Sequence, residues 1–317
     1  MKTTRMDASL QAFINDRYKA KLFVNEPDGA SDLHVLTNTI LRTNPPVISI
    51  VMPIFNQEDI IYKNLSSIVE MTTTTPYELI LIIDKCSDDT ETVVMKWVSE
   101  VSPNPLITRI LVIRSNIPLF ETAADNVGFL CAKGEFCLEL QADMEMTQRG
   151  YNEALLEPFR KVPNVIAVSG RCCHSFDIKL GIGKLGNLVE RPLSELPHID
   201  RNLFYICQTV NRGPILIHMK KLQELKYLDE RNFFQEYCDH DLFCRALLQR
   251  GWICGYRPIE FISLEKNGSM RKPRDPLNQE VYAAKKVATN GGRNGFFWKT
   301  YPLFPAATSI TAIRLTV

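Results

Sequence analysis

Apolar runs and amphipathic stretches alternate along the chain from residue 47 to residue 146. The apolar runs are rich in β-branched residues, as in strands buried on both faces, and lie at 47–53, 77–83, 106–113 and 136–140. The stretches between them carry apolar residues at helical spacing, at 58–70, 87–101 and 122–132. This alternation predicts an α/β fold with a Rossmann-like, mixed, mainly parallel sheet flanked by helices.

The second half of the chain has a less regular pattern. We expect strands at 165–169, 209–218 and 252–258, a Gly-punctuated loop at 180–197, and helices at 219–225 and 239–250. The main domain would span 45–265, with a nucleotide-sugar-binding half (45–146) and an acceptor half (147–265). Residues 1–44 form an N-terminal extension, partly helical at 9–22, and 266–317 form a C-terminal tail that serves as a lid or a docking segment.

Composition narrows the class of protein. The 317 residues are 45% hydrophobic and 23% charged with a net charge of +1, which excludes disorder and gives no reason to expect a nucleic-acid partner. No apolar run approaches the ~20 residues of a membrane span, and no signal peptide is visible. The nine cysteines include no CxxC pair. We therefore expect a cytoplasmic protein with reduced thiols, without a membrane span.

Polar and acidic residues follow the expected strands. They lie at Phe55–Glu58, Asp84–Asp89, Ser115–Asn116 and Gln141–Glu145, and three of these four segments carry carboxylates. Because the carboxyl ends of parallel strands meet at one edge, these carboxylates should converge there. A divalent cation or a ligand with many donors would resolve their mutual repulsion.

Several segments, in this order, resemble family 2 glycosyltransferases, which have the GT-A fold. The resemblance covers roughly residues 45–265. The segments are Ser49-Ile-Val-Met-Pro-Ile-Phe-Asn-Gln-Glu58, Ile83-Asp-Lys-Cys-Ser-Asp-Asp89, Asn126-Val-Gly-Phe-Leu-Cys-Ala-Lys-Gly-Glu-Phe136, Leu140-Gln-Ala-Asp-Met-Glu145, Asn211-Arg-Gly-Pro-Ile-Leu-Ile217, Leu228-Asp-Glu230 and Cys238-Asp-His-Asp-Leu-Phe-Cys-Arg245.

The resemblance implies a Mn²⁺ or Mg²⁺ ion near the fourth strand. Asp143 and Glu145 occupy the place of the family's DxD motif and are the candidate metal ligands, since hard cations prefer oxygen. Gln141 stands where the first Asp of that motif is usual, so that ribose or a metal-bound water becomes its expected partner.

The resemblance also implies a nucleotide site. Asp84 would accept the N3–H of a uracil ring, although Lys85 replaces the family's second Asp. The complete set of expected nucleotide-contacting residues is Pro53, Phe55, Asn56, Glu58, Asp84, Asn126, Gln141, Ala142 and Asp143.

Asp239 is the favoured catalytic base, with Asp241 as the alternative. Displacement at the anomeric carbon requires an acceptor hydroxyl that loses its proton, and a partly desolvated carboxylate at a helix start suits that role. Cys238 replaces the Glu that precedes this Asp in the family pattern. Both carboxylates could instead serve only to stabilise the helix N-terminus.

The resulting hypothesis is an inverting, metal-dependent hexosyl- or pentosyltransferase. It would use a UDP- or GDP-linked sugar and a glycan or glycoconjugate acceptor. One alternative, a sugar-1-phosphate nucleotidyltransferase, should carry a basic Gly-rich loop where Phe55–Glu58 stands. The other is a non-catalytic nucleotide-sugar- or glycan-binding protein. It is favoured by Lys85, Gln141 and Cys238, which replace acidic residues of the family pattern.

The C-terminal tail offers two further expectations. Its basic residues could cover the diphosphate, and they are Lys266, Arg271, Lys272 and Arg274. The aromatic segment 296–304 favours docking on the domain or a homodimer contact over a peripheral membrane contact.

Overall fold

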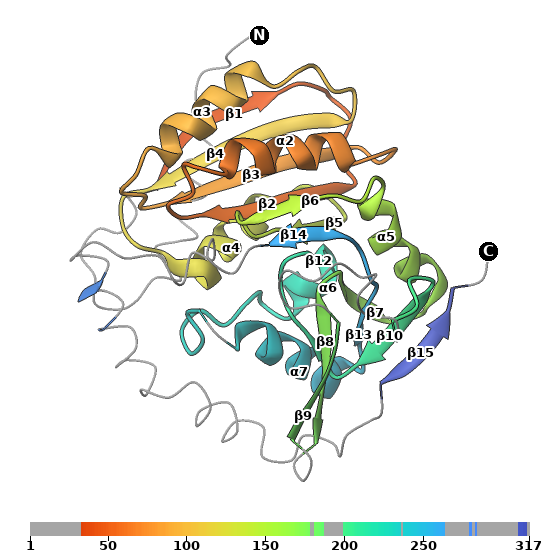
Figure 1. Cartoon of the computed structure of the whole chain (residues 1–317). Helices are drawn as coiled ribbons and strands as arrows, with labels where there is room; N and C mark the ends of the chain where they lie inside the picture. The colour runs from red at the N-terminus through yellow and green to blue at the C-terminus, as the bar shows by residue number, and fades with distance from the viewer. Residues whose placement is uncertain are drawn as a thin grey trace.

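The computed structural model describes residues 33–177, 181–186, 199–235, 237–263, 279–280, 283 and 310–315. A mixed ten-stranded sheet forms its centre (Figure 1). From one edge to the other, the strands are β1 (Leu33–Ile40), β4 (Ile107–Ser115), β3 (Tyr77–Asp84), β2 (Ile48–Ile54), β5 (Phe136–Glu139), β12 (Ile215–His218), β7 (Val165–Ser169), β13 (Ile253–Tyr256), β10 (Leu203–Cys207) and β15 (Thr311–Arg314).

The sheet is parallel where the nucleotide-binding half was expected. β4, β3, β2 and β5 run in one direction. β12 is antiparallel to both β5 and β7, while β13 is parallel to β7. The edge strands β1 and β15 are antiparallel to their neighbours β4 and β10. Strands β4, β3, β2, β5, β7, β13 and β15 therefore point one way, which confirms the expected mixed, mainly parallel sheet.

Helices cover both faces of the sheet and divide the core into two clusters. One face carries α2 (Ile61–Met71), α3 (Thr90–Glu100) and α5 (Tyr151–Lys161), and the other carries α4 (Phe120–Cys131), α6 (Met219–Glu224) and α7 (Cys238–Arg250). Figure 1 shows α2 and α3 in front of the sheet and α4 behind it. Strand β3 feeds both clusters, since its alternate side chains point to opposite faces.

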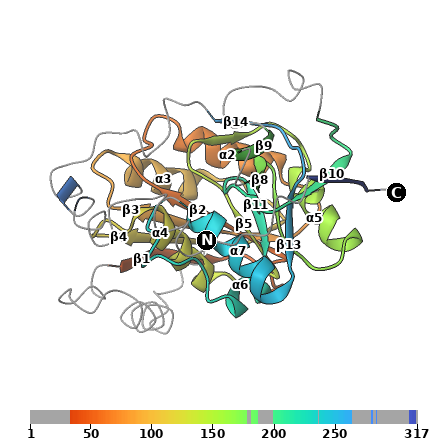
Figure 2. The same ribbon diagram turned by 90° about the horizontal axis from the view of Figure 1, so that it is seen from below.

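Two smaller sheets complete the described fold. β8 (Cys172–Asp177) pairs with β9 (Gly181–Gly186) and with β11 (Thr209–Val210). β11 packs against α7. Figure 2 shows β8, β9 and β11 in a view from below. β6 (Met144–Met146) pairs with β14 (Phe261–Ser263), which fixes the chain directly after the expected DxD position.

Glycine allows α4 to approach the sheet closely. A Cβ added to Gly128 would lie 2.2 Å from Cγ1 of Val51 on β2. Any side chain at this position would therefore push the helix away from the strand. This close approach gives a physical reason for the glycine in the Asn126–Phe136 segment.

The fold departs from the sequence predictions in several places. Residues 33–40, treated as part of an extension, form the edge strand β1, and residues 311–314 of the tail form β15. Residues 181–186, expected within a loop, form β9. The sequence patterns did not identify α5, β6, β8, β10 or β14. Long-range pairing, which a local pattern does not contain, fixes these short strands.

The strand expected at 209–218 is interrupted. It divides into β11 and β12, with Asn211–Pro214 between them. Gly213 has a φ of 55°, and the Gly213–Pro214 peptide bond is cis. A left-handed residue followed by a proline without an N–H cannot continue a strand ladder. The interruption brings Asn211–Pro214 to the carboxyl edge of the parallel strands.

Some predictions lie outside the described residues. They concern the helix at 9–22, the basic residues at 266–274 and the aromatic segment 296–304. Among the helices that the structure describes, none has the length and apolar character needed to cross a membrane.

Candidate active site

The loops after β2 and β3 are tied together by side chains. Oδ1 of Asn56 accepts the Ser87 N–H at 2.9 Å, and Nδ2 of Asn56 donates to Oγ of Ser87 at 3.0 Å. Oε2 of Glu58 accepts the Asp89 N–H at 2.7 Å. Phe55 is buried, and Pro53 is half-buried within β2. Asn56 and Glu58 therefore fix the shape of this edge, where a nucleotide was expected.

Asp84 is placed at the carboxyl end of β3, as expected, but it contacts backbone. Its Oδ1 accepts the Leu119 N–H at 2.6 Å, and its Oδ2 accepts the Phe120 N–H at 2.9 Å. These N–H groups lie at the start of α4, where a carboxylate is favoured by the helix dipole. Asp84 thus anchors α4, and its contact with a nucleobase stays a prediction.

Gln141 and Ala142 connect the loop after β5 to its surroundings. Nε2 of Gln141 donates to Glu121 at 2.7 Å, and its Oε1 accepts from Nη1 of Arg171 at 2.9 Å. The Ala142 carbonyl accepts from Nδ2 of Asn64 at 2.8 Å. This loop is therefore held from both faces of the sheet.

The two candidate metal ligands face different partners. Asp143 is half-buried and accepts a hydrogen bond from Oγ of Ser263 on β14 at 3.1 Å. Burial raises the pKa of Asp143, although Ser263 and the nearby Arg171 partly offset this increase. Glu145 forms a 2.7 Å ion pair with Lys63 on α2. The structure thus gives Glu145 a partner that Asp143 does not share.

The described residues fit a metal ion held by one protein carboxylate. Within them, no group of three or more His, Cys, Asp or Glu side chains could hold a metal ion by itself. Mg²⁺ commonly binds through one or two carboxylates together with substrate phosphates and water. Asp143 suits that mode, because it is partly desolvated and accepts a hydrogen bond from a neutral group, the Ser263 hydroxyl.

Asp239 lies in the first turn of α7 and is buried. Its Oδ2 accepts from Nδ2 of Asn211 and from the Arg212 N–H, both at 3.3 Å, and its Oδ1 accepts the His240 N–H at 2.8 Å. Burial raises the pKa of Asp239, but His240 and Arg212 outweigh burial and hold it below its ordinary value. The carboxylate is therefore ionised at neutral pH and fixed in orientation.

Asp241 faces the opposite way and has a bracing role. Its Oδ2 accepts from Nε of Arg245 at 2.8 Å, one turn further along α7. Arg245 also donates to the carbonyl oxygens of Leu225 at 2.5 Å and Tyr227 at 2.9 Å. Asp241 is thus part of an ion pair that holds the α6–α7 loop, and the role of Asp239 as the base stays a prediction.

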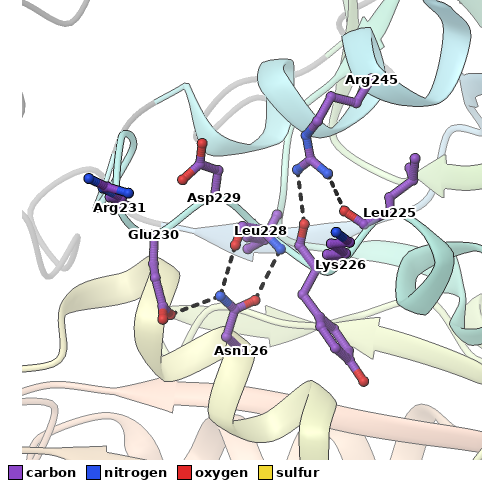
Figure 3. A pocket seen from close by; sticks show the side chains of 9 residues that line it. Asn126, Leu225, Lys226, Leu228, Asp229, Glu230, Arg231 and Arg245 are labelled. Atoms are coloured by element: carbon purple, nitrogen blue, oxygen red, sulfur yellow. Dashed lines mark hydrogen bonds between the residues drawn. The ribbon is translucent and has the colours of Figure 1, made fainter. Parts of the chain in front are cut away.

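Asn126 lines a cavity of about 320 Å³ beside the same loop. Its side chain donates to the Leu228 carbonyl at 3.0 Å and to Glu230 at 2.9 Å, and accepts the Leu228 N–H at 3.1 Å (Figure 3). Arg245 reaches the other side of this cavity in Figure 3. Asn126 therefore joins α4 to the α6–α7 loop, and its expected nucleotide contact stays a prediction.

An acidic cluster, defined here as the half-buried Glu121 and the buried Asp125 and Glu139, surrounds the guanidinium of Arg212. Arg212 pairs with Asp125 and, at 3.1 Å, with Glu121. Glu139 accepts the Gly213 N–H at 2.7 Å. Burial raises the pKa of Asp125 and that of Glu139, and the nearby Glu121 carboxylate raises both pKa values further, while Arg212 opposes the increase. One cation therefore faces three acids.

Sequence reasoning assigned no role to Arg212, Arg171 or the acidic cluster. Arg212 belongs to the Asn211–Ile217 segment, so the signal for it was present in the motif. Arg171 lies two residues after the end of β7 and could have been found by the same strand-end rule. Glu121 and Asp125 lie within a helix pattern that gives no indication of their partner.

One family model matches the chain from β2 to the end of α6. The model for "Glycosyl transferase family 2" matches residues 49–225, more than half of the chain. The chain belongs to this family. Among curated proteins, no match was found.

Solved structures similar to this family 2 member include a mannosyltransferase and TarS. Mannosyltransferase PcManGT from Pyrobaculum calidifontis, in complex with GDP-Man and Mn²⁺, has a TM-score of 0.50 and 16% identity, covering 94% of this chain and 88% of that one. TarS residues 1–349 from S. aureus, in complex with UDP, has a TM-score of 0.48 and 14% identity, covering 76% of this chain. The alignment covers 64% of that TarS chain, less than two thirds of its length.

These likenesses bear on the fold. At 16% identity, the similarity to the mannosyltransferase confirms the predicted GT-A-type architecture. The family 2 resemblance that the motifs indicated is likewise confirmed. The similarity does not identify the metal ion, the catalytic base or the acceptor of this chain.

Proposed function

We propose that this family 2 member transfers a hexosyl or pentosyl group from a UDP- or GDP-linked sugar to an acceptor hydroxyl, with inversion. The observation that carries the proposal is the ionised carboxylate of Asp239, fixed by three hydrogen bonds at the start of α7. It lies on the edge that also carries Asp143, and the side chains of Glu121 and Gln141 connect the two regions. The acceptor would be a glycan or glycoconjugate.

The donor nucleotide would bind along the loops after β2 and β3. Asn56 and Glu58 hold these loops in one arrangement, so backbone groups from Pro53 to Phe55 could face the base and ribose. The solved complexes of the similar proteins contain UDP in one case and GDP-Man in another. Both nucleotides therefore belong in the test.

Asp143 would hold the metal together with the donor diphosphate. When bound, Mn²⁺ or Mg²⁺ would neutralise negative charge developing on the diphosphate leaving group. Ser263 orients the Asp143 carboxylate, and Arg171 supplies a positive charge beside it. Gln141, held between Glu121 and Arg171, would keep the metal-side loop in place.

Asp239 would accept the proton of the acceptor hydroxyl. As the acceptor oxygen forms its bond to the anomeric carbon, the bond from that carbon to the diphosphate oxygen breaks, and the proton passes to Asp239. The nucleoside diphosphate leaves with the electron pair of the broken bond. A single displacement inverts the anomeric configuration, and rate enhancement comes from positioning and electrostatics.

The test is an assay of the purified chain with UDP- and GDP-sugars, with Mn²⁺ or with chelator, over a panel of glycan acceptors. We expect transfer with at least one donor, loss of transfer in chelator, and a product whose NMR spectrum shows inversion. Retained configuration would contradict the mechanism. Tight binding of a nucleotide-sugar without transfer or hydrolysis would favour a non-catalytic binding protein. Formation of nucleotide-sugar from sugar-1-phosphate would indicate a nucleotidyltransferase.

A further inference from the structure

Arg212 makes contacts with three separate parts of the chain. Its guanidinium pairs with Asp125 and Glu121 on α4 and donates to the Gln235 carbonyl at 3.2 Å. Its backbone N–H donates to Oδ2 of Asp239 at 3.3 Å. Gln235 lies three residues before the start of α7. One residue therefore contacts α4 and the approach to α7 through its side chain, and Asp239 through its backbone.

The same side chain is linked to the loop that carries Asp143. Glu121, which binds Nη2 of Arg212, also accepts from Nε2 of Gln141 at 2.7 Å. Gly213 adds a second link, because a Cβ there would lie 2.7 Å from Cγ of Gln141. The residues on either side of the active site thus meet through Arg212 and Gly213.

We propose that Arg212 is a positioning residue that couples the metal-side loop to the base Asp239 through Glu121 and Gln141. This inference rests on the proposed function. Arg212 would hold the Asp239 carboxylate at a fixed place relative to the metal-bound donor. Its planar guanidinium binds several acceptors in fixed directions, which the single ammonium of lysine cannot reproduce.

Charge balance supports this role. The groups that face Asp239 electrostatically include the cations or potential cations His240, Arg212 and His174. The acidic cluster faces Arg212 from the other side, and within the described residues Oδ1 of Asp125 and Oε1 of Glu139 have no hydrogen-bond partner. Removing Arg212 would leave these buried acids without a cation, and a proton would then be drawn toward Asp239 as well.

The test compares Arg212→Lys with the wild-type chain over a range of pH, with the metal and the best donor. We expect kcat to fall by about 10- to 100-fold, because a misplacement of ~1 Å can cost about 10²-fold. The KM for the donor should change by less than about twofold, since Arg212 touches no expected donor group. The acid limb of the kcat profile should move to higher pH, because Asp239 loses part of its stabilising partner.

Arg109→Lys is the matched control. Arg109 is also a buried arginine that binds a carboxylate, Glu78, and a backbone carbonyl, that of Cys131, but at the opposite edge of the sheet. We expect Arg109→Lys to lower the melting temperature without moving the acid limb. A shift of the same size in both variants would mean that Arg212 acts through general stability, which would overturn the inference.

Glu121→Gln tests the link itself and keeps the inference falsifiable if Arg212→Lys does not fold. It should lower kcat at nearly constant donor KM. The Glu121→Gln/Arg212→Lys double variant should lose little more than Arg212→Lys alone, because both changes break one link. If the kcat losses of the two single variants multiply in the double variant, or if Glu121→Gln keeps the wild-type kcat, this inference is overturned while the proposed function stands. A wild-type chain that transfers no sugar would overturn the proposed function, and this inference with it.

Discussion

Two buried arginines stand at opposite edges of the same sheet and show different charge balances. At the amino edge, Arg109 on β4 faces Glu78 on β3, and Glu78 also accepts from Ser49 at 2.5 Å and from the Lys133 N–H at 2.7 Å. At the carboxyl edge, Arg212 faces the three acids of the acidic cluster. The amino-edge pair is neutral as a whole, whereas the carboxyl edge keeps an excess of buried acid.

This difference in charge balance indicates different roles for the two edges of the sheet. The Arg109–Glu78 pair, with its contacts to Ser49 and Lys133, holds β2, β3, β4 and the turn before β5 together. An excess of buried carboxylates costs stability, and such a cost is typical of a site arranged for chemistry. The comparison predicts that changes at the amino edge affect mainly stability and that changes at the carboxyl edge affect mainly turnover.

The largest effect is expected for Asp239→Asn. Asparagine keeps the shape and can still accept hydrogen bonds but cannot take the acceptor proton, so transfer should fall by ~10²–10⁴-fold while donor affinity persists. Initial rates and calorimetry with the nucleotide measure both. Asp241→Asn is the matched control and should chiefly lower the melting temperature, since Arg245 loses its partner. A larger loss of turnover in Asp241→Asn would move the base two residues along α7.

Asp143→Ala should reduce Mn²⁺-dependent transfer to the level that the wild-type chain shows in chelator. It should also weaken nucleoside diphosphate binding measured with the metal present. Glu145→Ala, a nearby control, should have a smaller effect because Glu145 pairs with Lys63. Full wild-type activity in chelator would contradict the metal role.

Arg109→Met sharpens the comparison from the amino edge. It leaves Glu78 buried without its cation, so the free energy of unfolding should fall by about 3–5 kcal/mol. Urea unfolding followed by circular dichroism measures this change. Where the variant remains folded, kcat and its acid limb should match those of the wild-type chain. A shifted acid limb would show that the two edges are not independent.

Asp84→Ala tests a residue of the carboxyl edge that has a structural contact, because it binds backbone N–H groups at the start of α4. The N–H groups of Leu119 and Phe120 would lose their acceptor, and the free energy of unfolding should fall by about 1–2 kcal/mol. If Asp84 also contacts the base, the donor KM should rise more than kcat falls. Unchanged nucleotide affinity by calorimetry would leave Asp84 with the anchoring role alone.

The smallest effect is expected for Glu139→Gln and depends on pH. Burial raises the pKa of Glu139, so the folded chain binds this proton more tightly than the unfolded chain. Stability due to this group is therefore lost as pH rises from the unfolded pKa of about 4.3 through the raised folded value. The variant should gain stability relative to the wild-type chain at alkaline pH, because glutamine has no proton to lose. Parallel melting curves at pH 5 and pH 9 measure this, and an unchanged difference would contradict a raised pKa.

Local patterns predicted the regular part of the fold well. β7 matches its expected range, and β2, β3, β4, β5 and α2, α3, α4 lie where the apolar runs and helical spacings placed them, with shifts of a few residues. Burial on both faces gives such strands a continuous apolar run that can be read without the partner strand. The edge strands β1 and β15 carry no such run, because an edge strand is stabilised by pairing with a distant neighbour.

The sequence by itself determined the family, the alternation of strands and helices, and which residues follow each strand. It did so because these features depend on spacing along the chain. Only the tertiary structure showed the different partners of Asp239 and Asp241, the backbone contacts of Asp84 and Asn126, and the contacts of Arg212 with both α4 and Asp239. Side-chain direction and pKa depend on burial and on partners that are distant in sequence, such as Arg212 and Asp125, 87 residues apart.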